Sequence, residues 1–155
     1  MIKRVQANLE NKVKDYASKV RDRIQQKRKK KPNRKHSIYD YPTCVVACSY
    51  KNTKPVAKES GTCNANYYTN QKLLAELRKL KKYYGNNKVI GEESRLCDNI
   101  IGFCAEPKAA ELVLRVYHTS HFVDLNFSKA YRPRTSRVQN YCKNCKAVFP
   151  KLNKI

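Results

Sequence analysis

The sequence predicts an α/β layered domain preceded by a long basic amphipathic helix. A helical stripe of apolar residues runs through the first 31 residues, two segments after Ile38 have the composition of strands, and helical and strand patterns then alternate. A chain of 155 residues suits one folded unit with a modest core. We therefore divide the chain into a helical and polybasic segment, residues 1–36, and a folded domain, residues 37–155.

The first segment is predicted to form one amphipathic helix with a polybasic tail. Its apolar residues recur at steps of three or four, and they are Ile2, Val5, Leu9, Val13, Tyr16, Val20 and Ile24. The helix is expected to end in the run KRKKKPNRK, where Pro32 and Asn33 interrupt helical continuation. We expect the stripe to pack on the domain or on a second copy of the helix, which would be self-association. A narrow apolar face with few large aromatic residues disfavours a helix lying on a membrane surface.

The folded domain is predicted to have the order strand, strand, helix, helix, strand, helix. Residues 41–50 and 54–60 have strand composition, and residues 70–84 have a helical pattern bounded by Asn70 and Gly85. The face of that helix expected to point inwards holds Leu73, Leu74, Leu77 and Leu80. A loop over residues 86–102 precedes a helix that begins near Ala105, and residues 121–128 alternate as a strand. Residues 128–141 are expected to form a loop before a short final helix.

Two cysteine motifs carry the chemistry of the predicted site. Cys104 is followed two residues later by Glu106, and Cys142 and Cys145 are three residues apart. On a helical first turn the sulfurs of Cys142 and Cys145 lie on one side, so both can bind one ion. Three thiolates are a ligand set for Zn²⁺ that leaves one position open, which is typical of a catalytic zinc site. Glu106 would then lie beside the metal and move protons.

The alternative is a structural zinc site closed by a fourth ligand, for which Cys97, His118 and His121 are the candidates. Two of the remaining cysteines, Cys44 and Cys48, lie in a predicted buried strand and are expected to serve as small apolar residues. Seven cysteines cannot all pair in disulfides within one chain. We therefore expect a reducing compartment.

These motifs resemble the zinc-dependent cytidine and nucleic-acid deaminase superfamily, whose signature is His or Cys, any residue and Glu, followed later by Pro-Cys-x-x-Cys. The version here, CAEPKAA with CKNC, is most similar to the toxin-type (YwqJ-like) deaminases. The resemblance covers about Ile38 to Pro150, although Tyr141 stands where the signature has proline. It implies a three-layer sandwich with a central mixed β-sheet and flanking helices. It also implies Cys104, Cys142 and Cys145 as zinc ligands and Glu106 as the proton shuttle. Only ten residues follow Cys145, so the N-terminal helix is a candidate to cover the sheet.

The net charge of the chain indicates the class of substrate. The chain holds 34 Lys and Arg against 12 Asp and Glu, a net charge of +22. Such a field attracts polyanions, and nucleic acid is the polyanion that suits a deaminase-like site. Residues 128–141 interleave cations with aromatic rings, a pattern that suits a single strand. Candidate substrate-binding residues are Asn64, Tyr67, Tyr131, Arg132, Arg134, Arg137 and Tyr141.

The function predicted from the sequence is zinc-dependent hydrolytic deamination of cytosine or adenine in single-stranded or locally opened DNA or RNA. Deamination of a free nucleoside or nucleotide is one alternative, and a non-enzymatic nucleic-acid-binding protein with a structural zinc is the other. No run of about 18 apolar residues and no secretory signal is visible, so no membrane association is expected. The nucleus or cytoplasm is the expected location, with a delivered toxin domain left open.

Overall fold

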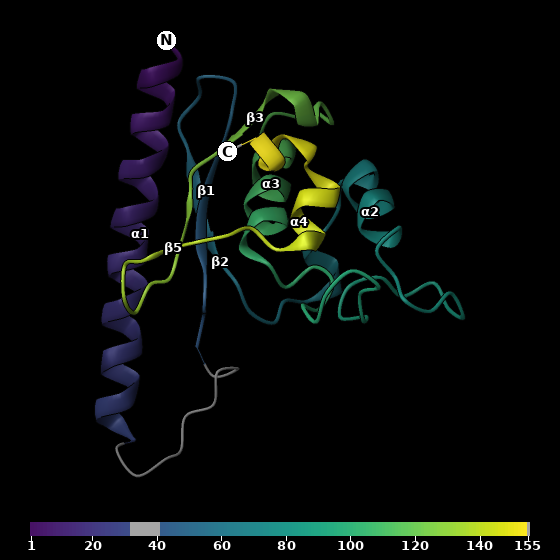
Figure 1. Ribbon diagram of the computed structural model, residues 1–155, viewed down its shortest axis with the longest axis horizontal. Coiled ribbons are helices and arrows are strands. Elements are labelled where there is room, and N and C mark those ends of the chain that lie inside the picture. The colour runs from purple at the N-terminus through teal and green to yellow at the C-terminus, as the bar shows by residue number, and fades with distance from the viewer. Residues whose placement is uncertain (32–40, 155) are drawn as a thin grey trace.

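A computed structural model describes residues 1–31 and 41–154 as a sheet between two layers of helices (Figure 1). The long helix α1 covers one face of the sheet, and α3 covers the other face with α4 and α2 beyond it. The elements are α1 (Ile2–Lys30), β1 (Val45–Tyr50), β2 (Val56–Glu59), α2 (Gln71–Arg78), α3 (Ala105–Val116), β3 (Leu125–Phe127), β4 (Ala130–Tyr131), β5 (Val138–Gln139) and α4 (Lys143–Val148), with short 3-10 turns between some of them. The predicted α/β layering is confirmed.

The helix α1 packs on the domain through its predicted stripe. The residues that it buries are Leu9, Val13, Ala17, Val20 and Ile24. They form a core layer with Val45 and Ala47 of β1, so α1 covers the open face of the sheet. Three stripe residues are less buried than predicted. Ile2 is 86 % exposed, whereas Val5 and Tyr16 are partly buried at the edge of the layer, where the Tyr16 hydroxyl donates to Glu59 Oε1 at 3.1 Å.

The polybasic tail is described only in part. The helix ends at Lys30, and the predicted breakers Pro32 and Asn33 lie outside the described residues. Self-association through α1 stays a prediction, but the apolar stripe on which it was based is used within the chain itself. None of the described helices combines the length and the apolar character needed to cross a membrane.

The sheet is antiparallel throughout its described pairings, whereas the resemblance implied a mixed sheet. The strand order is β2-β1-β4-β5, and β3 also pairs with β1. Because β1 is antiparallel to both β2 and β3, the latter two run in the same direction. The crossover through α3 places β3 beyond β1 rather than beside β2, so the two parallel strands never become neighbours.

The second predicted helix is shorter than expected. Asn70 caps α2 as predicted, by accepting a hydrogen bond from Leu73 N at 3.0 Å, but the helix ends at Arg78 rather than near Gly85. The chain beyond it pairs with the following loop through the bridge between Lys81 and Ser94. This pairing with a distant segment outweighs the helix propensity of residues 79–84. Leu80 is nevertheless part of the core, as predicted.

The region after α3 also differs from its prediction. Residues 122–124 form a 3-10 turn, so the strand expected over 121–128 begins only at Leu125. Val123 is exposed and breaks the expected alternation. The segment 128–141, expected to be a loop, contains the hairpin of β4 and β5. Strand pairing with β1 organises the start of this hairpin, a contact that local composition does not reveal.

Candidate metal centre

The three predicted thiols come from the first turns of two helices. Cys104 is the residue that precedes α3, and Cys142 is the residue that precedes α4. Cys145 lies in the first turn of α4, where Lys146 N donates to Cys142 O at 3.1 Å and closes that turn. Both helices lie on the face of the sheet opposite α1, and they bring cysteines 38 positions apart into contact.

The sulfur geometry fits one metal ion. The Sγ atom of Cys142 lies 3.5 Å from that of Cys104 and 3.5 Å from that of Cys145, and all three lie within 4.8 Å of one another. A tetrahedral zinc with Zn–S bonds of about 2.3 Å separates its sulfurs by about 3.8 Å, close to these distances. The separations are far too long for a disulfide of about 2.05 Å, and all seven cysteines are free.

The three thiols differ in their tendency to ionise. Hydrogen bonding with Cys104, and then with Cys145, lowers the pKa of Cys142 far below its ordinary value. The contact with Cys142, and then burial, raise the pKa of Cys104. Burial, and then the contacts with the other two thiols, raise the pKa of Cys145. One thiolate, Cys142, is thus stabilised by its two neighbours. The neighbours stay protonated because three adjacent negative charges would repel one another. A bound cation removes that repulsion and favours ionisation of all three.

Within residues 1–31 and 41–154, no fourth protein ligand joins these sulfurs. Among the described residues, the only group of three or more metal-ligating side chains is Cys104, Cys142 and Cys145. The candidates for closing the site, Cys97, His118 and His121, are not part of it. A bound metal would therefore keep a coordination position that no described side chain fills.

Glu106 lies beside the thiols in the first turn of α3 and is 3 % exposed. Burial, and behind it the charge of Cys142, raises the pKa of Glu106 to about 7. The carboxyl group can therefore hold or release a proton near neutral pH. A carboxyl group buried at this cost is more common in functional sites than in ordinary cores.

Cys44 and Tyr141 complete the surroundings of Glu106. The charge of Glu106 contributes to the raised pKa of both residues, after burial. Tyr141 is buried and its hydroxyl donates to Ser128 O, so the residue in the position of the signature proline fixes the entry to α4. Cys44 precedes β1 and lies near the site, whereas Cys48 is a fully buried core residue as predicted.

An asparagine network that the sequence did not reveal supports the thiols. Asn99 Nδ2 lies 3.9 Å from Cys104 Sγ, within reach of a weak hydrogen bond to sulfur. Asn144, from between the two cysteines of CKNC, donates to Asn99 O at 3.0 Å and lies 2.5 Å from Ser94 Oγ. Such contacts orient metal ligands. The position of Asn144 within the motif was the one available indication.

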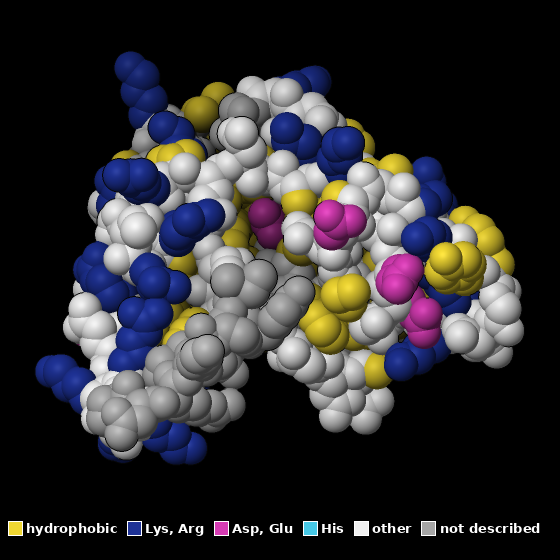
Figure 2. Space-filling view, turned by 60° about the horizontal axis from the view of Figure 1, so that its bottom comes forward, with side chains coloured by type: hydrophobic (Ala, Val, Ile, Leu, Met, Phe, Trp, Pro, Cys, Tyr) yellow, Lys and Arg dark blue, Asp and Glu magenta, His cyan; other side chains and the backbone are white. Residues whose placement is uncertain are grey.

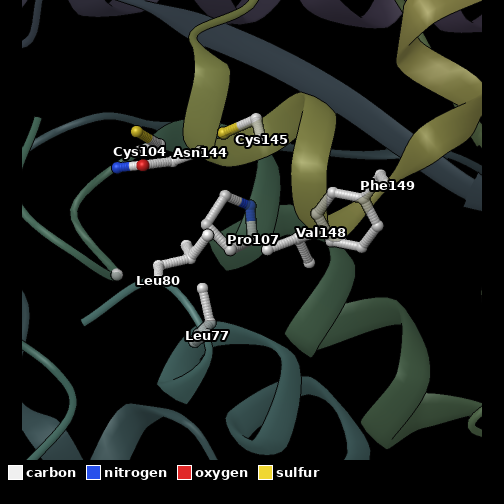
Figure 3. Close-up of a pocket in the computed structure, with 9 residues that line it drawn as sticks. Leu77, Leu80, Cys104, Pro107, Asn144, Cys145, Val148 and Phe149 are labelled. Carbon is white, nitrogen blue, oxygen red and sulfur yellow. The ribbon is translucent and has the colours of Figure 1, made fainter. Parts of the chain in front are cut away.

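A small apolar cavity adjoins the sulfurs (Figure 3). Cys104, Asn144 and Cys145 lie at one end of it, and Leu77 and Leu80 lie at the other. Its volume of about 10 Å³ has room for a single water molecule and not for a nucleobase. Glu106 does not line it.

The remaining predicted substrate-binding residues are dispersed. Tyr67 donates its hydroxyl to Lys108 O in α3 at 2.7 Å, and Asn64 caps the 3-10 turn of residues 65–67 that contains Tyr67. Tyr131 is buried on the opposite face of the sheet, where its hydroxyl donates to Glu10 Oε2 at 2.6 Å. That ring supports the contact with α1 and leaves no free face for a base.

The three arginines of the hairpin are exposed and lie in or beside its turn. They are Arg132, Arg134 and Arg137. Arg132 and Arg137 pair through their backbones, at 2.8 Å between Arg132 N and Arg137 O. Of the substrate-binding candidates, Tyr141 is the one that lies beside the thiols.

Comparison with known proteins adds no assignment. No family model, curated protein or solved structure matches this chain. The chemistry of the centre therefore has to follow from its own residues.

Proposed function

We propose that this protein is a zinc-dependent hydrolase that deaminates cytosine or adenine, in a base carried by single-stranded or locally opened nucleic acid. One observation carries the proposal: a buried carboxyl group, Glu106, whose pKa of about 7 suits proton transfer, lies beside three thiols that lack a fourth protein ligand among the described residues. A structural zinc site needs neither feature.

The choice of zinc rests on the donor set. Soft thiolate ligands favour zinc over magnesium, calcium or manganese, and the sulfur spacing suits a tetrahedral ion. Zinc held by three ligands supplies Lewis-acid chemistry, because it lowers the pKa of a water in its open position towards ~7. The roles assigned to Cys104, Cys142 and Cys145 are to hold the ion and to keep that position open.

Glu106 is assigned the proton transfers. Its carboxylate accepts a proton from the attacking water, whose oxygen bonds to the amine-bearing carbon of the base. Glu106 then delivers protons to the base, and the carbon–nitrogen bond breaks to release ammonia. A carboxyl group whose pKa is near the working pH can both accept and donate without a large penalty.

The resemblance to toxin-type deaminases is consistent with these assignments. The thiols begin two helices on one face of a sheet that is covered on both faces, with Glu106 one residue inside the first of them. The antiparallel sheet and Tyr141 in place of proline are departures from the pattern. The net charge of +22 favours a polyanionic substrate over a free nucleoside.

The test measures ammonia release and bound zinc in four proteins: wild type, Glu106→Gln, Cys142→Ala and the control Glu93→Gln. Glu93 carries an exposed carboxylate, so its substitution makes the same chemical change away from the centre. Substrates are single-stranded DNA, duplex DNA, RNA and free nucleosides. Glu106→Gln should keep its zinc and lose activity by at least about a hundredfold, because a general acid–base contributes about 10²–10⁴.

Cys142→Ala should lose zinc and activity together, while Glu93→Gln matches wild type. Full activity in Glu106→Gln would refute the role of that residue. Zinc bound by the wild type without ammonia release from any substrate would favour the structural-zinc alternative.

A further inference from the structure

A cationic cleft lies between α1 and the turn of the β4–β5 hairpin. Its wall on α1 is Arg21, Ile24, Gln25 and Arg28, and its wall on the turn is Arg134 and Thr135. Three of these six side chains are guanidinium groups, two are neutral polar groups, and none is acidic. We name this feature the arginine cleft.

The charges of the arginine cleft are not neutralised within the described part of the chain. Arg28 lies over the ring of Tyr41, 5.4 Å from its centroid, and its buried Nε has no hydrogen-bond partner among the described residues. Arg21 donates to Ser136 Oγ at 2.8 Å, which leaves its charge intact. Arg23, by contrast, pairs with Glu59 on another side of α1. A buried donor without a partner and three converging cations favour an anion as the missing partner.

The two elements that form the walls of the arginine cleft, α1 and the hairpin, are joined by hydrogen bonds. Glu10 of α1 accepts hydrogen bonds from Lys129 N at 2.9 Å and from the Tyr131 hydroxyl at 2.6 Å. At the other end, the bond from Arg21 to Ser136 fixes the turn against the helix. A site whose geometry exists before binding loses less entropy when a ligand arrives.

We propose that the arginine cleft binds backbone phosphates of a nucleic-acid strand. Planar guanidinium groups match phosphate oxygens with paired hydrogen bonds, and Gln25 and Thr135 add neutral donors. Lys and Arg side chains also gather over the α1 side of the molecule (Figure 2), so the cleft lies within a wider positive surface.

An acidic protein is the less suitable partner. Stable protein interfaces need exposed apolar or aromatic anchors at their centre. Ile24 is the single apolar residue lining the cleft, and it is buried. The exposed large apolar residues of α1, Met1 and Ile2, lie at the far end of the helix.

The hairpin links the arginine cleft to the metal centre. From the turn, β5 leads directly into Tyr141 and Cys142, and Gln139 donates to Thr43 O, the residue before Cys44. The seven residue-to-residue steps from Thr135 to Cys142 span at most ~23 Å when extended. A strand held in the cleft therefore has a short path to Glu106. The choice of a polynucleotide as the ligand rests on the proposed function, whereas the phosphate site itself does not.

The test is the affinity of the zinc-loaded full chain for a fluorescent 20-nucleotide oligothymidylate, measured across a salt series. The variant is Arg28→Gln with Arg134→Gln. Its matched control is Lys14→Gln with Lys27→Gln, since both lysines are exposed on α1, form no ion pair with a described residue and give the same change of net charge. Arg21 is left intact because it also fixes the turn. Thermal unfolding checks that each variant is folded.

Each phosphate contact on a single strand contributes ~0.7 to the slope of log affinity against log salt. The cleft variant should reduce the slope by about 1.4 and the affinity at 0.15 M salt by about tenfold, with a much smaller change in the control. If the double variant unfolds, Arg134→Gln alone is used, because that side chain is exposed and has no ion pair or side-chain hydrogen bond with a described residue. It should reduce the slope by about 0.7.

Equal losses in the cleft variant and its control would overturn the proposal, because they would show a general field instead of a site. Binding of poly-glutamate is measured alongside. If the cleft variant loses poly-glutamate binding but keeps oligothymidylate binding, the proposal is overturned in favour of an acidic protein as the partner. Binding is read without ammonia release, and Glu106→Gln should bind the strand as wild type does. A failure of the deaminase assignment is thus separate from a failure of the phosphate site.

Discussion

The burial of Glu106 leads us to predict an effect on the free energy of unfolding that does not depend on catalysis. In the metal-free, reduced protein, Glu106→Gln should change how the free energy of unfolding varies with pH. The folded-state pKa of about 7 lies above the ordinary value of 4.5, because burial disfavours the charged form. Below pH 4.5 the group is protonated in both states, and the wild type keeps its full stability.

Between these two values the unfolded chain releases the proton while the folded chain retains it, so stability falls as the pH rises. At 1.36 kcal/mol per pH unit, the gap from 4.5 to about 7 corresponds to about 3 kcal/mol. Glutamine does not titrate. The difference in unfolding free energy, variant minus wild type, should therefore grow by about 3 kcal/mol between pH 4 and pH 8.

Urea unfolding with a chelator and a reductant, followed by circular dichroism at several pH values, measures this difference. Subtracting the variant removes the thiol titration that both proteins share, apart from the part that the charge of Glu106 contributes. Glu93→Gln, at an exposed carboxylate, should give a nearly flat difference. A flat difference for Glu106→Gln as well would refute the argument that this carboxyl group is buried at a cost.

Two further substitutions test the packing. Leu9→Ala, at a fully buried contact of α1 with the sheet, should cost about 2–5 kcal/mol in urea unfolding, whereas the exposed Ile2→Ala should change stability by less than about 0.5 kcal/mol; equal effects would mean that α1 does not pack as described. Gly102→Ala should cost at least about 1–3 kcal/mol, because its φ is +84° and a Cβ would lie 2.7 Å from Ile90 Cδ1. Gly85→Ala is the control, since no atom lies within 4 Å of its Cβ position, and a similar loss there would contradict this reasoning.

Local spacing was enough for the features whose partners lie nearby in the sequence. The 3.6-residue period predicted α1 and four of the five residues that it buries, and the pattern after Cys104 predicted the start of α3. Both follow from helix geometry, which places residues three and four apart on one face. Ala17 was missed because alanine carries little apolar weight, although its small side chain lets the helix approach the sheet.

The cysteine triad was predictable only in part from local spacing. Spacing alone placed Cys142 and Cys145 together, but the contact with Cys104 depends on two helices meeting on the same face of the sheet. The family signature supplied that expectation, and the contact is present. The lack of a fourth ligand among the described residues is a property of the fold, since Cys97 and the two histidines of residues 118–121 were equally available in the sequence.

By itself, the sequence determined the amphipathic N-terminal helix, the candidate metal ligands and the excess of positive charge. Tertiary structure decided the pKa of Glu106, the burial of Tyr131 on the far face, the early end of α2 and the meeting of Arg28 with Arg134 across a cleft. The physical reason is the sequence separation of the residues involved. Periodicity and charge are sums over neighbouring residues, whereas burial and the convergence of cations depend on contacts such as that between Arg21 and Ser136, 115 residues apart.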